Sequence, residues 1–197
     1  MNWSDNIERI HSILSSLVVS NGKGHPMDSD TAFRIWQEHT LHIRTQRRTV
    51  YLIGNGASAS MASHMAADLA KNAHVHTEVF SDLSLITAVA NDLCYEEVFS
   101  EPLRRRMQPG DMLVAISSSG NSPNILRALD TALDLDGQVT TLSAMKPENK
   151  LRTKGHLNFY VPANTYGMAE SCHAAILHFW MDLVSNTSAG QGGKNHG

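Results

Sequence analysis

Cysteine, positive charge and long apolar runs are all scarce in this chain. Its 197 residues include only two cysteines, Cys94 and Cys172. Two are too few for a disulfide scaffold and suit a reducing compartment, so we expect a cytoplasmic protein. The 16 Lys and Arg residues against 19 Asp and Glu leave a formal net charge of −3, which predicts no nucleic-acid partner. No apolar stretch approaches the length of a bilayer span, so we expect no membrane association.

The composition that remains is that of an ordinary globular protein. Hydrophobic residues make up 42% of the chain and charged residues 18%, values that allow a full core at this length. We expect a single domain over residues 1–185, with helices within residues 1–47. Small and polar residues fill positions 186–197, which we expect to be a disordered tail.

Apolar periodicity predicts the order of the elements. Short apolar runs bounded by turn residues indicate buried strands, and apolar residues at helical spacing indicate helices. Strands are expected within 49–54, 74–80, 112–116, 138–144 and 156–163. Helices are expected over 3–20, 30–45, 60–72, 84–92, 95–107, 123–135 and 167–184. This alternation predicts an α/β fold with a doubly wound, mainly parallel sheet flanked by helices. The two helices before the first of these strands have little sheet to cover, so we expect them to pack against another subunit or in a separate helical layer.

The stretch Asp111–Ser122, DMLVAISSSGNS, carries the strongest functional signal. An apolar strand ends in a turn rich in hydroxyl groups, and Pro123 then opens a helix. Unpaired N–H groups and the positive dipole end of such a helix bind anions, and serine hydroxyls add donors. No GK[ST] follows, so this is not a nucleotide-triphosphate loop. We therefore expect a phosphomonoester on Ser117, Ser118, Ser119 and Ser122, rather than a flexible loop with one capping serine.

A glycine-rich turn, Gly54-Asn55-Gly56-Ala57-Ser58, ends the first of these strands. Its GxGxxS pattern differs from the dinucleotide fingerprint, and alone it is a weak signal. Ligands of open α/β sheets bind at the carboxyl ends of neighbouring strands, so we expect this turn to meet the serine turn there.

Two helices each offer an imidazole and a carboxylate. His64 and Asp68 are four residues apart on one helix, and Glu170 and His178 share a face of the apolar last helix. These four side chains are suitable ligands for zinc or a similar divalent ion. They equally suit an acid–base pair for proton transfer next to a carbonyl, and His64 with Asp68 could simply be an exposed surface pair. Cys172 and the neighbouring His173 lie off this face, and we expect them to be structural.

The segments GNGAS, HMAADL, AVAND, AISSSGNS and the final Y...E..H....H resemble the SIS (sugar isomerase) domain family. Within that family the chain is most similar to phosphoheptose isomerases, over about residues 30–185. The resemblance implies a homotetramer with active sites at subunit interfaces and, in several members, a zinc ion. It also implies phosphate binding by the serine turn with Asn55, Gly56 and Ser58, and contact of Asp92 with sugar hydroxyls.

Two positions depart from the family pattern. Asp68 stands where the family has a catalytic glutamate, and Glu170 stands where it has a glutamine. Aspartate is one methylene shorter, so either the site contracts or Asp68 serves mainly as a metal ligand. Two carboxylates with two imidazoles make a more anionic set, which favours a bound cation.

The resemblance thus implies an aldose–ketose isomerase that acts on a sugar phosphate, with sedoheptulose 7-phosphate as the expected substrate. Asp68 would remove a proton to give an enediolate, and His178 would protonate or polarise the oxygen. One alternative is a non-catalytic SIS regulator that binds a phosphosugar or a protein, as replication-initiator-associating members do. Another is an isomerase for a different sugar chain length. Such regulators tend to lack the base and the last histidine, so the presence of all four residues favours the enzyme.

Overall fold

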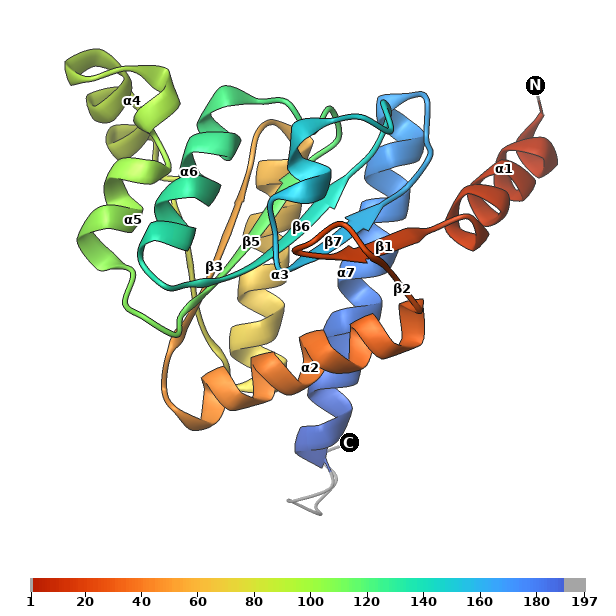
Figure 1. Cartoon of the computed structure of the whole chain (residues 1–197), viewed down its shortest axis with the longest axis horizontal. Helices are drawn as coiled ribbons and strands as arrows, with labels where there is room; N and C mark the ends of the chain where they lie inside the picture. The colour runs from red at the N-terminus through yellow and green to blue at the C-terminus, as the bar shows by residue number, and fades with distance from the viewer. Residues whose placement is uncertain (1, 190–197) are drawn as a thin grey trace.

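The computed structural model describes residues 2–189 and contains a single seven-stranded sheet with helices on both faces (Figure 1). The strands are β1 (Val18–Asn21), β2 (Pro26–Met27), β3 (Thr49–Gly54), β4 (His76–Val79), β5 (Met112–Ser117), β6 (Gln138–Ser143) and β7 (Leu157–Tyr160). Their order across the sheet is β2-β1-β7-β6-β5-β3-β4. The five strands from β3 to β7 are parallel, and β1 and β2 join one edge antiparallel. The predicted α/β fold with a mainly parallel sheet is confirmed.

Seven α-helices and two 3₁₀ turns connect these strands within the described residues. They are α1 (Trp3–Ser15), α2 (Ser29–Thr45), α3 (Ala57–Ala73), α4 (Leu83–Asp92), η1 (Tyr95–Glu97), α5 (Ser100–Arg106), α6 (Pro123–Asp134), η2 (Lys150–Thr153) and α7 (Tyr166–Ala189). None of these helices combines the length and apolar character that a membrane span needs.

The prediction of one helix over residues 3–20 was wrong. α1 ends at Ser15, and Val18–Asn21 forms β1, which pairs antiparallel with β7. The β-branched pair Val18 and Val19 favours a strand, and pairing with β7 buries Val19 and Ser20. The apolar spacing of this segment fits a helix as well. The segment forms a strand because it can pair with the edge of β7, a contact that the local sequence does not reveal.

Two other boundaries differ from the prediction. Residues 95–107 form η1 and the short α5 instead of one helix. The arginines at the end of α5 form ion pairs: Arg104 with Glu97 and Glu101, Arg105 with Glu101, and Arg106 with Glu78. The last helix continues to Ala189, so residues 186–189 of the expected tail are helical. Residues 190–197 lie outside the described residues.

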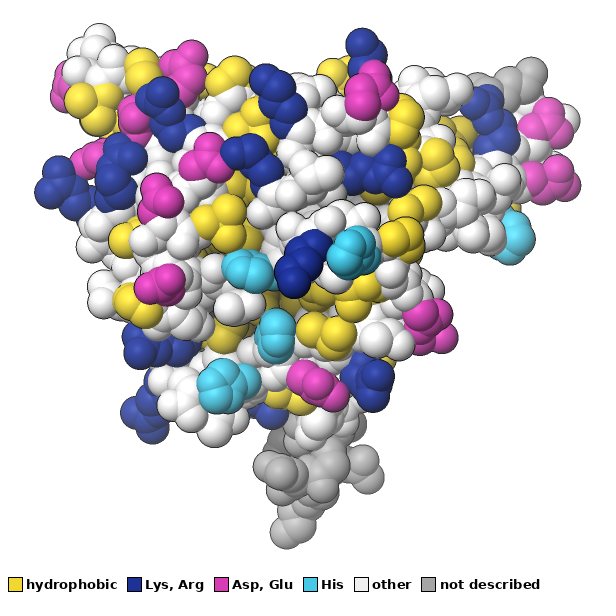
Figure 2. Space-filling view, in the orientation of Figure 1, with side chains coloured by type: hydrophobic (Ala, Val, Ile, Leu, Met, Phe, Trp, Pro, Cys, Tyr) yellow, Lys and Arg dark blue, Asp and Glu magenta, His cyan; other side chains and the backbone are white. Residues whose placement is uncertain are grey.

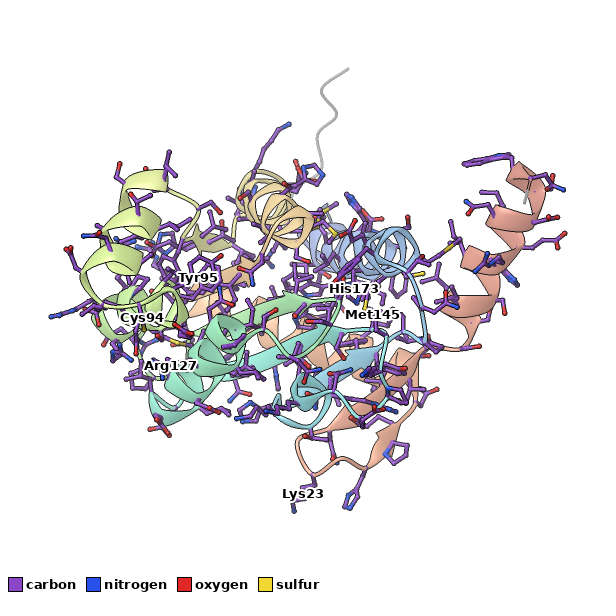
Figure 3. All side chains as sticks on the ribbon, turned by 90° about the horizontal axis from the view of Figure 1, so that it is seen from above. Lys23, Cys94, Tyr95, Arg127, Met145 and His173 are labelled. Atoms are coloured by element: carbon purple, nitrogen blue, oxygen red, sulfur yellow. The ribbon has the colours of Figure 1, made fainter. Side chains whose placement is uncertain are left out.

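Two hydrophobic cores cover the two faces of the sheet. Residues of α2, α3 and α7 fill one core, and residues of α4, α5 and α6, with Val98 and Phe99 after η1, fill the other. Figure 3 shows α3 and α7 side by side on one face, with α6 on the opposite face. Both α3 and α7 begin at the carboxyl edge of the parallel strands, because each follows the end of a strand, β3 or β7.

Aromatic side chains pack α2 against α7 and the sheet in the first core. The rings of Trp36 and Trp180 stack with centroids 4.1 Å apart, and Trp36 also contacts Phe159 on β7 at 5.1 Å. The Trp180 indole donates to the Thr40 hydroxyl at 3.0 Å. α2 therefore packs on its own sheet, and the expectation that both N-terminal helices lack sheet to cover was wrong for α2.

α1 projects away from the sheet (Figure 1). None of its residues, all of which are described, is buried, and Trp3 is 74% exposed. Its capping box between Asn2 and Asp5 stabilises the first turn, and Ile10, Ile13 and Leu14 nearer its end are partly buried against the first core.

The stacked tryptophans generate a prediction on stability. Trp36→Ala should lower the free energy of unfolding by about 3–5 kcal/mol, because it empties a fully buried aromatic site. Trp36→Phe is the matched control. The Trp36 indole N–H has no partner among the described residues, so phenylalanine loses packing area but no hydrogen bond. Equal losses for the two variants in urea denaturation would contradict this account.

Candidate active site

The serine turn and the glycine turn line one pocket at the carboxyl edge of the sheet. β3 and β5 are neighbouring parallel strands with Gly54 opposite Ile116, so the turns that follow them lie side by side. The pocket has a volume of about 160 Å³. Its polar lining comprises Asn55, Ser58, Ser117, Ser118, Ser119, Ser122, Tyr166 and Glu170. We call it the serine cradle, and the structure thus brings together the residues predicted to bind phosphate, apart from the Gly56 backbone, which caps α3 next to it.

The hydroxyl groups of the cradle have unused capacity for hydrogen bonding. The buried Ser118 Oγ has no hydrogen-bond partner among the described residues. Ser117 and Ser122 share one long contact of 3.4 Å, and the Ser122 side chain does not cap α6 although Ser122 is its N-cap residue. Because an unsatisfied buried hydroxyl is costly, a cradle with free donors at a helix N-terminus fits a bound phosphate.

A pair of side-chain amides joins the two turns. Asn55 Nδ2 donates to Asn124 Oδ1 at 3.0 Å, and Asn124 Nδ2 donates back to Asn55 Oδ1 at 2.9 Å. Tyr95 Oη adds a longer contact with Asn55 Oδ1 at 3.3 Å, and Asn124 is only 2% exposed. The Asn55 side chain therefore holds the glycine turn against the start of α6. Most of its hydrogen-bonding capacity is used within the protein, so it has little to offer a ligand.

Glycine is required at two positions beside the cradle. Gly56, the N-cap of α3, has φ 56° and ψ −125°, a conformation that side chains with a Cβ avoid. Gly120 has φ 62°, and a Cβ there would lie 2.0 Å from Asn149 Oδ1. The Gly120 carbonyl accepts from the Leu151 N–H, so this residue fastens the serine turn to η2.

Three of the four predicted ligand residues form a second cluster on α3 and α7. His64, Asp68 and His178 each place one ligand atom so that all three lie within 4.8 Å of one another. His64 Nε2 is 3.5 Å from Asp68 Oδ2, and the two imidazole rings meet edge to face at 5.4 Å. The His64 side chain is 57% exposed and that of Asp68 26%, so the cluster reaches solvent. The alternative that His64 and Asp68 form only an exposed surface pair is thus incomplete, because His178 lies beside them.

The donors in this cluster fit a divalent metal. Two imidazole nitrogens and a carboxylate oxygen are the set that catalytic zinc uses, with a further position left for water or substrate. The atoms lie near enough for small side-chain movements to bring them onto one ion. The chain therefore has residues that could hold zinc or a similar divalent cation.

Two predicted site residues lie elsewhere in this chain. Glu170 is not in the cluster, because it lies two turns before His178 on α7 and lines the serine cradle instead. Asp92 ends α4, is exposed and accepts a hydrogen bond from Asn91 at 2.9 Å. It does not line the cradle of its own chain. Sequence spacing could not reveal this, because α4 is separated from the cradle by tertiary packing.

The structural role expected for Cys172 and His173 agrees with their burial. Both are 0% exposed and face the sheet from α7; Figure 3 marks His173. Burial lowers the pKa of His173 to about 4, so its ring is neutral at physiological pH. Burial raises the pKa of the Cys172 thiol.

Three residues of the site were missed in the sequence. Asn124 follows Pro123 in the first turn of α6, and a buried polar residue there could have suggested a partner. Tyr166 opens the last segment that carries the family resemblance, but no role was assigned to it. Tyr95 carries no such signal, because it is a surface aromatic that approaches the cradle only through the fold.

The sequence comparisons place the chain in a family. The SIS domain model matches residues 34–144. A phosphoheptose isomerase from Shewanella denitrificans is 33% identical over 148 residues, which cover 71% of this chain and 76% of that protein. A second, from Shewanella sp. strain W3-18-1, is 32% identical over 158 residues, or 76% of this chain and 80% of that protein.

Solved structures agree with this relationship. The phosphoheptose isomerase of Neisseria gonorrhoeae superposes with a TM-score of 0.73 at 27% identity, covering 78% of this chain and 86% of that one. The phosphoheptose isomerase of Francisella tularensis has the same fold, with a TM-score of 0.79 at 21% identity over 94% of this chain and all of that one. The chain belongs to the SIS domain family, in which the curated relatives that it resembles by sequence are phosphoheptose isomerases.

Proposed function

We propose that this protein is an aldose–ketose isomerase acting on a sugar phosphate, with sedoheptulose 7-phosphate as the substrate. The observation that carries the proposal is a phosphate-sized cradle and an acid–base cluster on helices that share one edge of the sheet. Ser58 lines the cradle from the first turn of α3, and the helix rise places His64 about 9 Å and Asp68 about 15 Å further along the axis. A phosphate held in the cradle would direct an open-chain sugar toward these side chains.

The serine cradle is proposed to bind the phosphate alike in the ground state and the transition state. Ser118 Oγ and the hydroxyls of Ser117, Ser119 and Ser122 supply donors, and the N-terminus of α6 supplies a favourable dipole. Such uniform binding holds the substrate without lowering the barrier of the chemical step. Glu170, at the rim of the cradle, is proposed to accept hydrogen bonds from sugar hydroxyls.

Asp68 and His178 are proposed to transfer the protons. Asp68 accepts a proton from the carbon next to the ketose carbonyl, and the electron pair of the broken C–H bond forms the enediolate. His178 donates a proton to the carbonyl oxygen and later takes one from the adjacent hydroxyl, while Asp68 returns its proton to the neighbouring carbon. His64 orients Asp68 through their 3.5 Å contact. A zinc ion held by His64, Asp68 and His178 would supply electrostatic stabilisation of the negative oxygen.

A regulatory function is not favoured. The Vibrio vulnificus NanR protein, solved in complex with ManNAc-6P, and the RpiR transcription factor of Sphaerobacter thermophilus share the fold at 18% and 15% identity, with TM-scores of 0.60 and 0.61. Those likenesses show the fold alone. The relatives at 33% and 32% identity are named as enzymes, and the clustered His64, Asp68 and His178 supply groups for proton transfer.

Isomerisation in deuterated water tests the proposed reaction. Purified protein should convert sedoheptulose 7-phosphate to an aldose phosphate that carries solvent deuterium at the carbon next to its carbonyl, detected by NMR. Five- to eight-carbon ketose phosphates run in parallel would reveal a different chain length. Conversion without deuterium would show that the proton on Asp68 does not exchange with solvent before it is returned, and no conversion of any ketose phosphate would overturn the function.

Two variants should separate binding from chemistry in the same assay. Ser118→Ala should raise KM by about tenfold or more with kcat little changed, since a hydrogen bond to a charged group is lost. This change removes no hydrogen bond within the described protein, so the fold should be unaffected. Asp68→Asn should lower kcat by about 10² to 10⁴. Ser60→Ala, on an exposed position of α3, is the control, and an unchanged KM in Ser118→Ala would refute the cradle.

The metal assignment predicts a further set of results. Chelator treatment should remove activity, and a divalent ion should restore it. His178→Ala and His64→Ala should lose bound metal as well as turnover, as measured by elemental analysis of the purified proteins. His74→Asn, at the left-handed C-cap of α3 outside the cluster, should keep both. A fully active preparation without metal would refute the metal role and leave Asp68 and His178 as an unassisted pair.

We also propose that the protein assembles as a homotetramer with active sites between subunits. Large apolar side chains are exposed on three helices: Trp3 and Ile7 on α1, Leu83 on α4 and Phe179 on α7. The Phe179 ring contacts Phe33 at 4.8 Å and is still 47% exposed, so it adds to the apolar surface over α2 and α7 that a subunit could cover. Asp92 lies on α4, away from the cradle of its own chain, which suits a contact with the substrate of a neighbouring subunit.

Light scattering at micromolar concentration checks the assembly. The expected mass is about four times the 21.6 kDa of one chain. Trp3→Ser combined with Ile7→Ser should lower this mass, because the change removes apolar area without touching a buried core residue. A monomeric mass for the unaltered protein would contradict the proposal.

A further inference from the structure

A second pocket lies at the amino edge of the parallel strands, opposite the serine cradle. Its volume is about 390 Å³, within the range of small-molecule sites. It lies between α2 and the residues that precede β3 and β5 and begin β6. We call it the His39 pocket, defined by His39, His42, Gln46, Arg48 and Gln138.

The spacing of α2 builds one wall of this pocket. His39, His42 and Gln46 are at positions i, i+3 and i+7, so they share one face of the helix. The turn that ends α2 then places Arg48, whose N–H donates to the Ile43 carbonyl at 2.9 Å. Figure 2 shows histidine side chains gathered over α2 and the adjoining edge of the sheet.

The polar side chains of the His39 pocket are unpaired. Across the described residues, the side chains of His39, His42, Gln46, Arg48 and Gln138 form no hydrogen bond or ion pair, and no carboxylate lines the pocket. The carboxyl end of a helix carries a partial negative charge that repels anions. At the end of α2, the N–H groups of Gln46 and the two following residues donate to the last carbonyls, which reduces this repulsion. The pocket therefore offers several unpaired donors and has no lining carboxylate to repel an anion.

The charges around His39 favour an anion. Burial lowers the pKa of His39, and the imidazoles of His156 and His42 lower it further, while Glu38 acts in the opposite direction. The lowered pKa favours the neutral ring of His39, so Arg48 is the cation of the pocket that attracts an anion. Ile43, which is 2% exposed, gives the pocket an apolar floor for the body of an organic ligand.

A metal fits these histidines less well. His156 Nδ1 accepts the Val139 N–H at 3.0 Å, so the neutral ring carries its proton on Nε2 and presents a donor there. Among the described residues, the His39, His42 and His156 nitrogens do not converge as those of His64 and His178 do. We infer that the His39 pocket binds a small organic oxyanion, a phosphate or a carboxylate, at a site separate from the serine cradle.

Calorimetric titration of the full protein tests this inference independently of isomerase activity. Inorganic phosphate should bind at two sites per chain, and Ser118→Ala should weaken only the cradle site. Arg48→Gln should weaken the other site by about tenfold or more, because a charge-assisted contact is lost. Citrate is then titrated into the Ser118→Ala protein in the presence of phosphate. Displacement of phosphate by citrate would show that the His39 pocket accepts carboxylates, and no displacement would show that it is selective for phosphate.

Arg47→Gln is the matched control. It removes the same charge from the residue that directly precedes Arg48 and that does not line the pocket. His42→Gln is the second pocket variant, and circular dichroism should show that all variants fold. Equal effects of Arg47→Gln and Arg48→Gln would indicate only general surface attraction and overturn the inference. A single phosphate site per chain, abolished by Ser118→Ala, would overturn it as well.

Discussion

The constraint on which the rest of this structure depends is the parallel pairing of β3 and β5. Their register sets Gly54 opposite Ile116, so the glycine turn and the serine turn leave the sheet at the same edge. Because parallel strands need crossover connections, a helix begins at each of these turns, and its N-terminus points at the shared pocket. The reciprocal amide pair of Asn55 and Asn124 then fixes the two turns to each other.

The packing of α7 is the second condition for a working site. The stack of Trp180 on Trp36, with the Thr40 hydroxyl bonded to the indole, holds α7 against α2 and the sheet. His178 is two residues before Trp180, so this buried contact also sets the position of a predicted catalytic imidazole. Core packing and catalytic geometry are thus coupled on one helix, while the cluster itself remains accessible to solvent.

The two edges of the sheet differ in their chemistry. The serine cradle presents hydroxyl donors at the carboxyl edge, and the cluster of His64, Asp68 and His178 lies along the helices that start there, a set suited to holding a phosphate and moving protons. The amino edge presents imidazoles, amides and a guanidinium without a lining carboxylate. A carboxylate repels a bound anion, so its presence near the substrate suits the edge where a reaction needs a base. The amino edge has no lining carboxylate and is suited to binding alone.

The sequence by itself determined the α/β fold, most of its strands, the serine cradle and the pairing of His64 with Asp68. Strand runs, turn residues and helical spacing are local properties, so they can be read without the fold. Only the tertiary structure brought His178 to that pair, directed Glu170 to the cradle, left Asp92 on a separate helix and made β1 a strand. These outcomes depend on how helices and strands pack across long sequence separations, and side-chain periodicity within one element does not specify that packing.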